Sequence, residues 1–255
     1  MITGASSGIG YDLSKKFIKQ GYQLVLVARD GQKLEKIASE FKKNHAAEII
    51  CIKKDLSQPH AGKEIFETLK NKNIFVEVLV NNAGFGLHGS YAETDLNKEL
   101  DMVNLHIGSF LYLTKVFLKD MISKKTGKIL NVGSVYSYSS VPNQSVYAAT
   151  KAFMLSFSES LRHELKGSGI HVTLLCPGIT QTEFRKRMGV SDKKSHHGMS
   201  SKQVADIAYQ ALMKKKFLAV PGGVNKFYVF LAKTLPKPFM TNLIDFLNHF
   251  RGINQ

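Results

Sequence analysis

The stretch Thr3-Gly4-Ala5-Ser6-Ser7-Gly8-Ile9-Gly10 decides the fold of this chain of 255 residues. Its three glycines let the backbone turn tightly and come close to a ligand. The residues from Ile9 onward read as an amphipathic helix, whose first turn offers free N–H groups and the positive end of a dipole. A turn of this kind binds pyrophosphate, and it predicts a dinucleotide site where it opens an alternation of strands and helices.

The rest of the chain supplies that alternation. Short runs rich in β-branched residues alternate with longer amphipathic stretches, which is typical of a parallel sheet covered by helices on both faces. Expected strands occupy 23–28, 48–54, 77–81, 128–134, 171–176 and 217–220. Expected helices occupy 9–20, 31–44, 58–72, 96–123, 146–167 and 201–215. We predict an α/β, Rossmann-like doubly wound sheet in one domain, with 1–221 as the main body and 222–255 as a C-terminal helical tail.

Composition excludes several classes of protein. Hydrophobic residues make up 44% of the chain, as in globular proteins. No apolar run reaches the roughly 18 residues that span a bilayer, and the pattern of a signal peptide is missing. The net charge of +15 comes from scattered lysines without a nucleic-acid-binding motif, so we expect a cytoplasmic protein with no nucleic-acid partner. Cys51 and Cys176 lie in apolar runs and are expected to be buried free thiols.

A second group of polar residues suggests proton transfer. Tyr147 and Lys151 stand one helical turn apart, so a phenol and an ammonium would lie on one face. Ser134 follows a β-like run and would project from the carboxyl end of its strand. A nearby positive charge favours the phenolate, which predicts a Tyr147 pKa below its usual value of about 10. A hydroxyl, an acidified phenol and a lysine at one point suit proton exchange with an alcohol or carbonyl oxygen.

With these motifs together, the chain resembles the short-chain dehydrogenase/reductase family over residues 2–221. The glycine turn matches that family's Gly-x-x-x-Gly-x-Gly, and the Tyr-x-x-x-Lys pair with its upstream serine matches the family's active site. The resemblance implies a catalytic tetrad of Ser134, Tyr147, Lys151 and Asn104, the last taken from Met102-Val-Asn-Leu. The cofactor residues that it implies are Gly4, Ser6, Ser7, Gly8, Ile9, Gly10, Arg29, Asp55, Leu56, Asn82, Ala83, Gly84, Tyr147, Lys151, Pro177, Gly178, Ile179 and Thr182.

The resemblance also implies the chemistry, that of an NADPH-dependent carbonyl reductase that is reversible as an alcohol dehydrogenase. Tyr147 would donate a proton to a carbonyl oxygen that Ser134 also hydrogen-bonds, while NADPH delivers hydride to the carbon. Lys151 would bind the nicotinamide ribose and lower the Tyr147 pKa, and Asn104 would hold a water that leads to solvent. His106, near Asn104, is expected to be a packing or interface residue. The implied assembly is a homodimer or homotetramer.

The choice of cofactor rests on the run Val27-Ala-Arg29-Asp30. About 20 residues after a glycine turn, NAD sites carry an acid for the ribose hydroxyls, whereas an arginine suits the extra phosphate of NADP. Arg29 therefore favours NADP(H) over NAD(H), and a surface pair of Arg29 with Asp30 is the alternative. No metal site is expected, because His196 and His197 lack a Cys or carboxylate cluster at ligand spacing.

The N-terminus departs from the family. The glycine motif begins at residue 3, so the first strand of the sheet is largely missing and its two neighbours would lose a pairing partner. We expect the true start to lie upstream. A truncated, inactive member of the family is one alternative function, and a non-catalytic protein that senses the cofactor is another.

The C-terminal tail and a basic loop at 180–200, expected to be mobile, are the other variable parts. They would shape the substrate pocket together with 85–90 and 135–144. Prolines divide the tail into two helices, and Phe239, Leu243, Phe246 or Leu247, and Phe250 fall on one face of the second. The tail either caps the pocket or a dimer interface, or rests on an anionic membrane and serves lipophilic ketoacyl- or steroid-like substrates.

Overall fold

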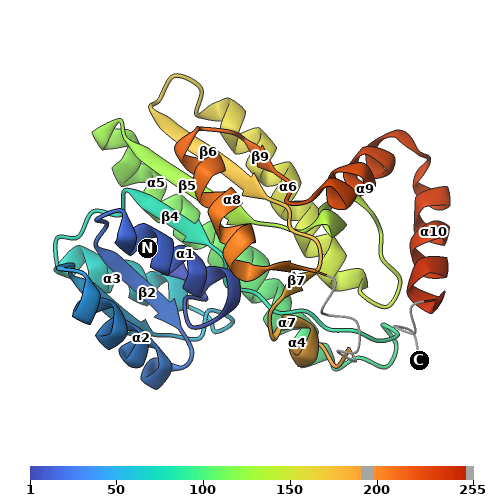
Figure 1. Ribbon diagram of the computed structural model, residues 1–255, viewed down its shortest axis with the longest axis horizontal. Helices are drawn as coiled ribbons and strands as arrows, with labels where there is room; N and C mark the ends of the chain where they lie inside the picture. The colour runs from blue at the N-terminus through green and yellow to red at the C-terminus, as the bar shows by residue number, and fades with distance from the viewer. Residues whose placement is uncertain (191–197, 251–255) are drawn as a thin grey trace.

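A parallel sheet forms the centre of the computed structural model, which describes residues 1–190 and 198–250 (Figure 1). The strand order β3-β2-β1-β4-β5-β6-β9 confirms the predicted Rossmann-like fold. All described pairings within this sheet are parallel. The strands are β1 (Ile2–Thr3), β2 (Leu24–Ala28), β3 (Ile49–Lys53), β4 (Val78–Asn81), β5 (Gly127–Val132), β6 (Ile170–Leu175) and β9 (Leu218–Ala219).

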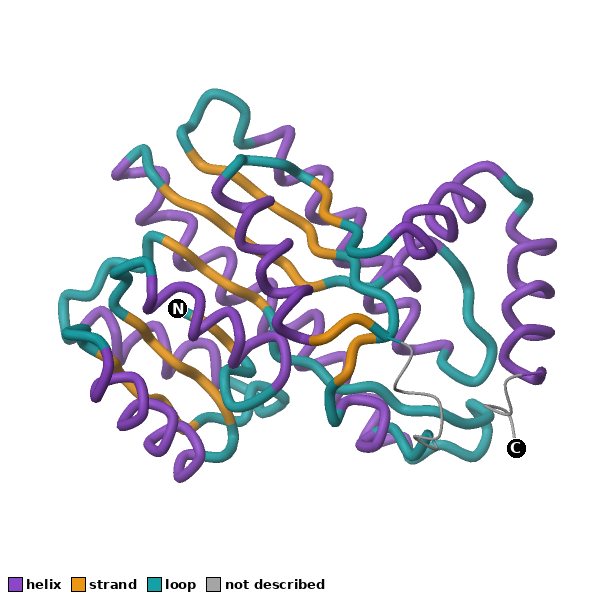
Figure 2. Tube along the Cα trace, viewed as in Figure 1, coloured by secondary structure: helices purple, strands orange, loops and turns teal. Residues whose placement is uncertain are grey.

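Helices cover both faces of the sheet, and an apolar cluster lies under each set (Figure 2). One face is covered by α1 (Gly8–Lys19), α2 (Gly31–Asn44) and α8 (Ser201–Met213). The other face is covered by α3 (Ala61–Asn71), α5 (Phe110–Lys124) and α6 (Ser145–Glu164). The long helix expected at 96–123 consists of α4 (Leu96–Val103), a π-helical turn η1 (Asn104–Ser109) and α5.

Local sequence explains these elements. All residues of β2 are buried, as expected for a central parallel strand that is covered on both faces. The Asp30 carboxylate begins α2 by accepting a hydrogen bond of 2.9 Å from the Lys33 N–H. The helix then buries Leu34, Ile37 and Phe41 at helical spacing.

The first strand is short but present at the centre of the sheet. Ile2 and Thr3 pair with Leu26 and Val27 of β2, and Ile2 also pairs with Val80 of β4. The loss of a pairing partner expected from the sequence is therefore partial, because two residues of β1 fill the gap between the neighbouring strands. The Met1 amine lies inside the sheet and donates a hydrogen bond of 2.7 Å to a carbonyl oxygen of β4.

The tail forms two helices, α9 (Gly223–Thr234) and α10 (Lys237–Phe250), which extend away from the sheet (Figure 1, red). Met240 and Ile244 of α10 pack inward against Val141 and Ala148. Phe239 and Phe246, which the sequence places on one helical face, are 57% and 67% exposed. The aromatic face of α10 therefore lies largely at the surface, and a different face holds the helix to the body.

Short elements in the basic loop were not expected from the sequence. β7 (Thr180–Gln181) pairs with β8 (Met199–Ser200), and α7 (Phe184–Arg187) lies between them in the chain. A 3-10 turn, η2 (Val135–Tyr138), follows β5. The part of the basic loop at 191–197, which includes His196 and His197, and the Phe250 side chain lie outside the described residues.

In a chain that begins at Met1, the buried amine makes stability depend on pH. Burial lowers the pKa of the Met1 amine from 8.0 to about 5. Between these values the unfolded chain binds more protons than the folded one, so lowering the pH destabilises the fold. An added Val-Ile-Val before Met1 should extend β1 and remove this effect. Relative to that variant, the free energy of unfolding of the chain beginning at Met1 should fall by roughly 1.4 kcal/mol per pH unit between pH 8 and pH 5.

Urea unfolding at several pH values measures this difference. A Gly-Ser-Gly extension is the matched control, because it moves the ammonium away from the sheet without favouring a strand. It should remove the same pH dependence with less added stability. An unchanged pH dependence in both extended chains would show that the Met1 amine is not its source.

Candidate active site

The glycine turn between β1 and α1 forms a cradle at the carboxyl edge of the sheet. Gly4 and Gly8 have φ values of +66° and +54°, which favour glycine. A Cβ at Gly10 would lie 2.3 Å from the Gly4 carbonyl oxygen, so a side chain there would displace the backbone. The Ser7 side chain makes no capping hydrogen bond to α1. The first turn of α1 thus keeps the open N–H groups that suit an anion.

Two other predicted loops meet this turn. The Asn82 side chain, after β4, donates hydrogen bonds of 2.9 Å to the Thr3 carbonyl and 3.3 Å to the Gly4 carbonyl. From the loop after β6, Thr182 comes so close that a Cβ at Gly8 would lie 3.0 Å from its Cγ2. The structure therefore brings together three segments that the sequence predicted for the cofactor.

The remaining predicted cofactor residues line or flank this edge at different depths. Leu56 and Gly10 are buried, whereas Gly84 and Ile179 are exposed. Partly buried positions are Ser6, Ser7, Gly8, Ile9, Asp55, Asn82, Ala83, Pro177, Gly178 and Thr182.

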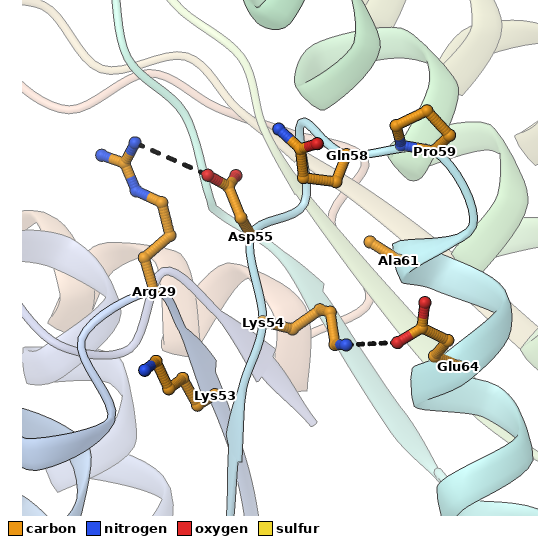
Figure 3. Close-up of a pocket in the computed structure, with 8 residues that line it drawn as sticks. All are labelled: Arg29, Lys53, Lys54, Asp55, Gln58, Pro59, Ala61 and Glu64. Carbon is orange, nitrogen blue, oxygen red and sulfur yellow. Dashed lines mark hydrogen bonds and ion pairs between the residues drawn. The ribbon is translucent and has the colours of Figure 1, made fainter.

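Arg29 borders a cavity of about 410 Å³ at the ends of β2 and β3 (Figure 3). Its guanidinium lies 4.0 Å from the Asp55 carboxylate, and its side chain is 66% exposed. Asp30 is occupied as the N-cap of α2, so the expected alternative of a pair between Arg29 and Asp30 is not what the structure shows. Lys53 and Lys54 also line the cavity, and Lys54 pairs with Glu64. Asp55 and Glu64 lie among the same lining residues, so three cations face two carboxylates and the lining has a small positive excess.

Ser134, Tyr147 and Lys151 come together as predicted. All three are buried, with exposed fractions of 7%, 8% and 5%. The Ser134 and Tyr147 side chains are hydrogen-bonded to each other. The Lys151 Nζ lies 5.7 Å from the centre of the Tyr147 ring and donates a hydrogen bond of 2.9 Å to the Val132 carbonyl. A proton donor or acceptor, a second hydroxyl and an amine thus share one point beyond β5.

The pKa of Tyr147 moves in the opposite direction to the sequence prediction. Burial raises the pKa of this phenol, and the hydrogen bond with Ser134 offsets the rise only in part. Burial also lowers the pKa of Lys151 to about 8. The expectation that the lysine charge would dominate is wrong for this structure, because removal of the phenol from water is the largest influence on its pKa.

Asn104, the fourth residue of the predicted tetrad, begins η1, and its catalytic role stays a prediction. It is exposed, whereas His106 is 2% exposed and its ring meets that of Tyr147 edge to face, with 5.9 Å between centroids. Positions two apart on a helix point about 200° away from each other, so only one of them can face Tyr147. Met102 and Phe110 are buried at helical spacing from His106, and this periodicity was the signal that could have identified it.

Aromatic and thioether side chains lie on the segments that the sequence predicted to shape the substrate pocket. The Phe184 ring of α7 lies 5.8 Å from the Tyr147 ring. Met188 covers Gly86, where a Cβ would lie 3.0 Å from its Sδ. Tyr228 of α9 lies 6.5 Å from Tyr136 of η2 and is hydrogen-bonded to Ser139. Among the described residues, no group of His, Cys, Asp and Glu is placed to hold a metal ion.

Comparison with known proteins finds dehydrogenases among the relatives of this chain. The family model for short chain dehydrogenase matches residues 1–192. The NADP-dependent 3-hydroxy acid dehydrogenase of Schizosaccharomyces pombe is 29% identical over 247 residues, which cover 89% of this chain and 95% of that protein. The structure of a short-chain dehydrogenase from Sphingobium yanoikuyae in complex with NADPH has a TM-score of 0.82 and 27% identity, covering 92% of this chain and 95% of that one. The bulky-bulky ketone specific alcohol dehydrogenase from Comamonas testosteroni has a TM-score of 0.79 and 28% identity, with 91% and 89% covered.

Proposed function

The chain belongs to the short-chain dehydrogenase family, and we propose that it is an NADPH-dependent carbonyl reductase that also runs in reverse as an alcohol dehydrogenase. The observation that carries this proposal is the buried, hydrogen-bonded pair of Ser134 and Tyr147 beside Lys151. The glycine cradle supports it, because the missing Cβ atoms leave room for a ligand to approach the backbone at the start of α1. We place the active site in 1–221 and treat 222–255 as a tail of the same domain.

In the proposed reaction, Tyr147 gives its proton to the substrate carbonyl oxygen. Ser134 donates a hydrogen bond to the same oxygen and stabilises the negative charge that develops there. Lys151, from its place beside the ring, holds the ribose of the cofactor through its ammonium. A bound nicotinamide would supply the hydride to the carbonyl carbon or accept it in the reverse direction.

Removal of one oxygen atom tests this role of Tyr147. Tyr147→Phe should lower kcat by roughly 10²–10⁴-fold, since the variant loses the proton donor and keeps the ring. NADPH binding, measured by fluorescence titration, should be unchanged. Tyr91→Phe is the control, because Tyr91 is 64% exposed. Equal turnover of the Tyr147→Phe variant and the wild type would refute the assignment.

We propose NADPH over NADH because of the charge around Arg29. The residue lies at the end of β2, where its exposed guanidinium would meet the extra phosphate, with Lys53 lining the same cavity (Figure 3). Two of the relatives named above are NADP-dependent or were solved with NADPH, which supports the same choice.

Arg29→Gln should weaken NADPH binding by roughly 10–100-fold, as expected for loss of a hydrogen bond to a charged group. The affinity for NADH should stay constant, because NADH lacks the phosphate. Titrations of both cofactors into wild type, Arg29→Gln and the exposed-residue control Lys98→Gln measure the difference. Tighter binding of NADH than of NADPH by the wild type would contradict the proposed cofactor.

The proposed substrate is a lipophilic ketone, of ketoacyl or steroid-like character. Phe184 packs against the Tyr147 ring, and Met188 and Tyr228 lie on segments expected to shape the pocket, so apolar and aromatic surface is available to a hydrophobic ligand. The similar enzyme from Comamonas testosteroni is specific for bulky ketones, which supports this class. NADPH oxidation across a panel of ketones, aldehydes and ketoacyl thioesters would identify the substrate.

The exposed face of the tail is proposed to rest on an anionic membrane. No helix in the described part of the chain is both long and apolar enough to cross a bilayer. On α9, Val224, Phe227 and Phe230 are 83%, 61% and 58% exposed. The exposed Lys226 lies one turn from Phe230, beside this apolar strip, whereas the Lys233 Nζ lies 5.0 Å from the centre of the Tyr138 ring.

Co-sedimentation with phosphatidylglycerol vesicles tests the membrane proposal. The wild type should bind, binding should weaken as salt is raised, and Phe227→Ser with Phe230→Ser should abolish it. Tyr91→Ser is the control for loss of an exposed aromatic residue. Failure of the wild type to bind would remove the proposal. A double variant that loses a dimer in light scattering would instead assign this face to a homodimer, which we also expect from the family resemblance.

A further inference from the structure

His106 is a buried imidazole that the proposed reaction does not use. It lies in η1, and both of its ring nitrogens have partners. Nδ1 is 2.9 Å from the Thr150 hydroxyl of α6, and Nε2 accepts a hydrogen bond of 3.3 Å from the Phe85 N–H after β4. The imidazole thus joins Thr150 and Phe85, which lie 44 and 21 residues from His106 in the chain.

These partners determine which nitrogen carries the proton. A backbone N–H can only donate, so Nε2 is bare and the proton is on Nδ1. The Thr150 hydroxyl donates its own proton to the Tyr147 carbonyl at 2.8 Å, which leaves its oxygen free to accept from Nδ1. The result is an ordered chain of hydrogen bonds from Phe85 through His106 and Thr150 to the backbone of Tyr147.

Ring contacts fix the same geometry. The imidazole meets the Tyr147 ring edge to face and lies 6.3 Å from the Phe85 ring. A Cβ at Gly84 would come within 2.7 Å of Nε2, so the loop after β4 lies directly against the imidazole. His106 therefore contacts both the Tyr147 ring and, through Thr150, the Tyr147 main chain.

We propose that His106 is a positioning residue for Tyr147, a neutral bridge that sets the distance between α6 and the loop after β4. The inference rests on the proposed reductase function, since it assigns His106 to support of the proton donor. The task of His106 is to hold geometry, and it transfers no proton.

The surroundings keep the imidazole neutral. Burial and the nearby Lys151 charge hold the pKa of His106 well below its usual range. The titratable groups beside it, Tyr147 and Lys151, both come from α6, and Phe85 on the other side carries no charge. Protonation of Nε2 would also break its hydrogen bond with the Phe85 N–H.

The first experiment does not depend on turnover. Nitrogen-15 spectra of labelled histidine side chains, with the His106 signals identified by their loss in His106→Asn, report tautomer and titration directly. The expected result is an Nδ1–H imidazole that does not titrate between pH 5 and pH 8. An Nε2–H form, or a titration within this range, would overturn the proposal.

The second experiment compares pH profiles of kcat and KM. His106→Leu removes both hydrogen bonds and should lower kcat by roughly 10–100-fold, as expected for a misplaced reacting group. His106→Asn, which keeps a donor near Nδ1, should recover part of this loss. His163→Asn is the matched control, because His163 is exposed on α6, the helix that carries Tyr147.

The outcomes separate the inference from the proposed function. An acid limb in the wild-type kcat that disappears in His106→Leu would show proton transfer by His106 and refute a purely positioning role. Unchanged kcat and pH profile in His106→Leu would also refute it. Absence of turnover in the wild type with every carbonyl substrate, together with the expected Nδ1–H spectrum, would contradict only the reductase function and leave the bridge geometry in place.

Discussion

The Thr3 side chain joins β1 and the glycine turn to β4 and the loop that follows it, and the geometry of the site depends on these hydrogen bonds. Its hydroxyl donates a hydrogen bond of 3.1 Å to the Val80 carbonyl and accepts from the N–H groups of Asn82 and Ala83 at 2.9 and 3.0 Å. A two-residue strand has little ladder of its own, so these side-chain bonds hold β1 against β4. The same bonds fix the glycine turn relative to the loop after β4, and the cofactor and proton-transfer ends of the site are aligned through them.

Most of the sheet could be predicted from the sequence because its strands are continuous apolar runs. Leu24–Ala28 and Ile170–Leu175 are bounded by turn residues, and periodicity identifies their neighbouring helices. The pairs Thr180–Gln181 and Met199–Ser200 are too short to carry any period. Their pairing depends on contacts made after the chain folds back, and local pattern contains no information about that.

The sequence predicted which side chains lie together where a motif also defines geometry, and it did not predict what burial decides. The glycines and the Tyr147–Lys151 pair have spacings that a turn or helix converts directly into positions in space. Asn104 matched a motif, but it lies where a π-helical turn interrupts the helix, and the buried face of that turn presents His106 instead. The pKa prediction failed for a related reason, because a charge pair is visible in sequence whereas the loss of solvent around it is not.

Burial also affects the protonation states of the side chains at the site. Tyr147, Lys151 and His106 all shift towards their neutral forms: the phenol keeps its proton, the amine pKa falls to about 8 and the imidazole stays uncharged. A protonated phenol is the form that reduction of a carbonyl requires, whereas oxidation of an alcohol requires a phenolate. At neutral pH the free protein therefore holds its proposed catalytic residue ready to donate. Oxidation of an alcohol has the added cost of removing a proton from a buried phenol, so its rate should rise with pH.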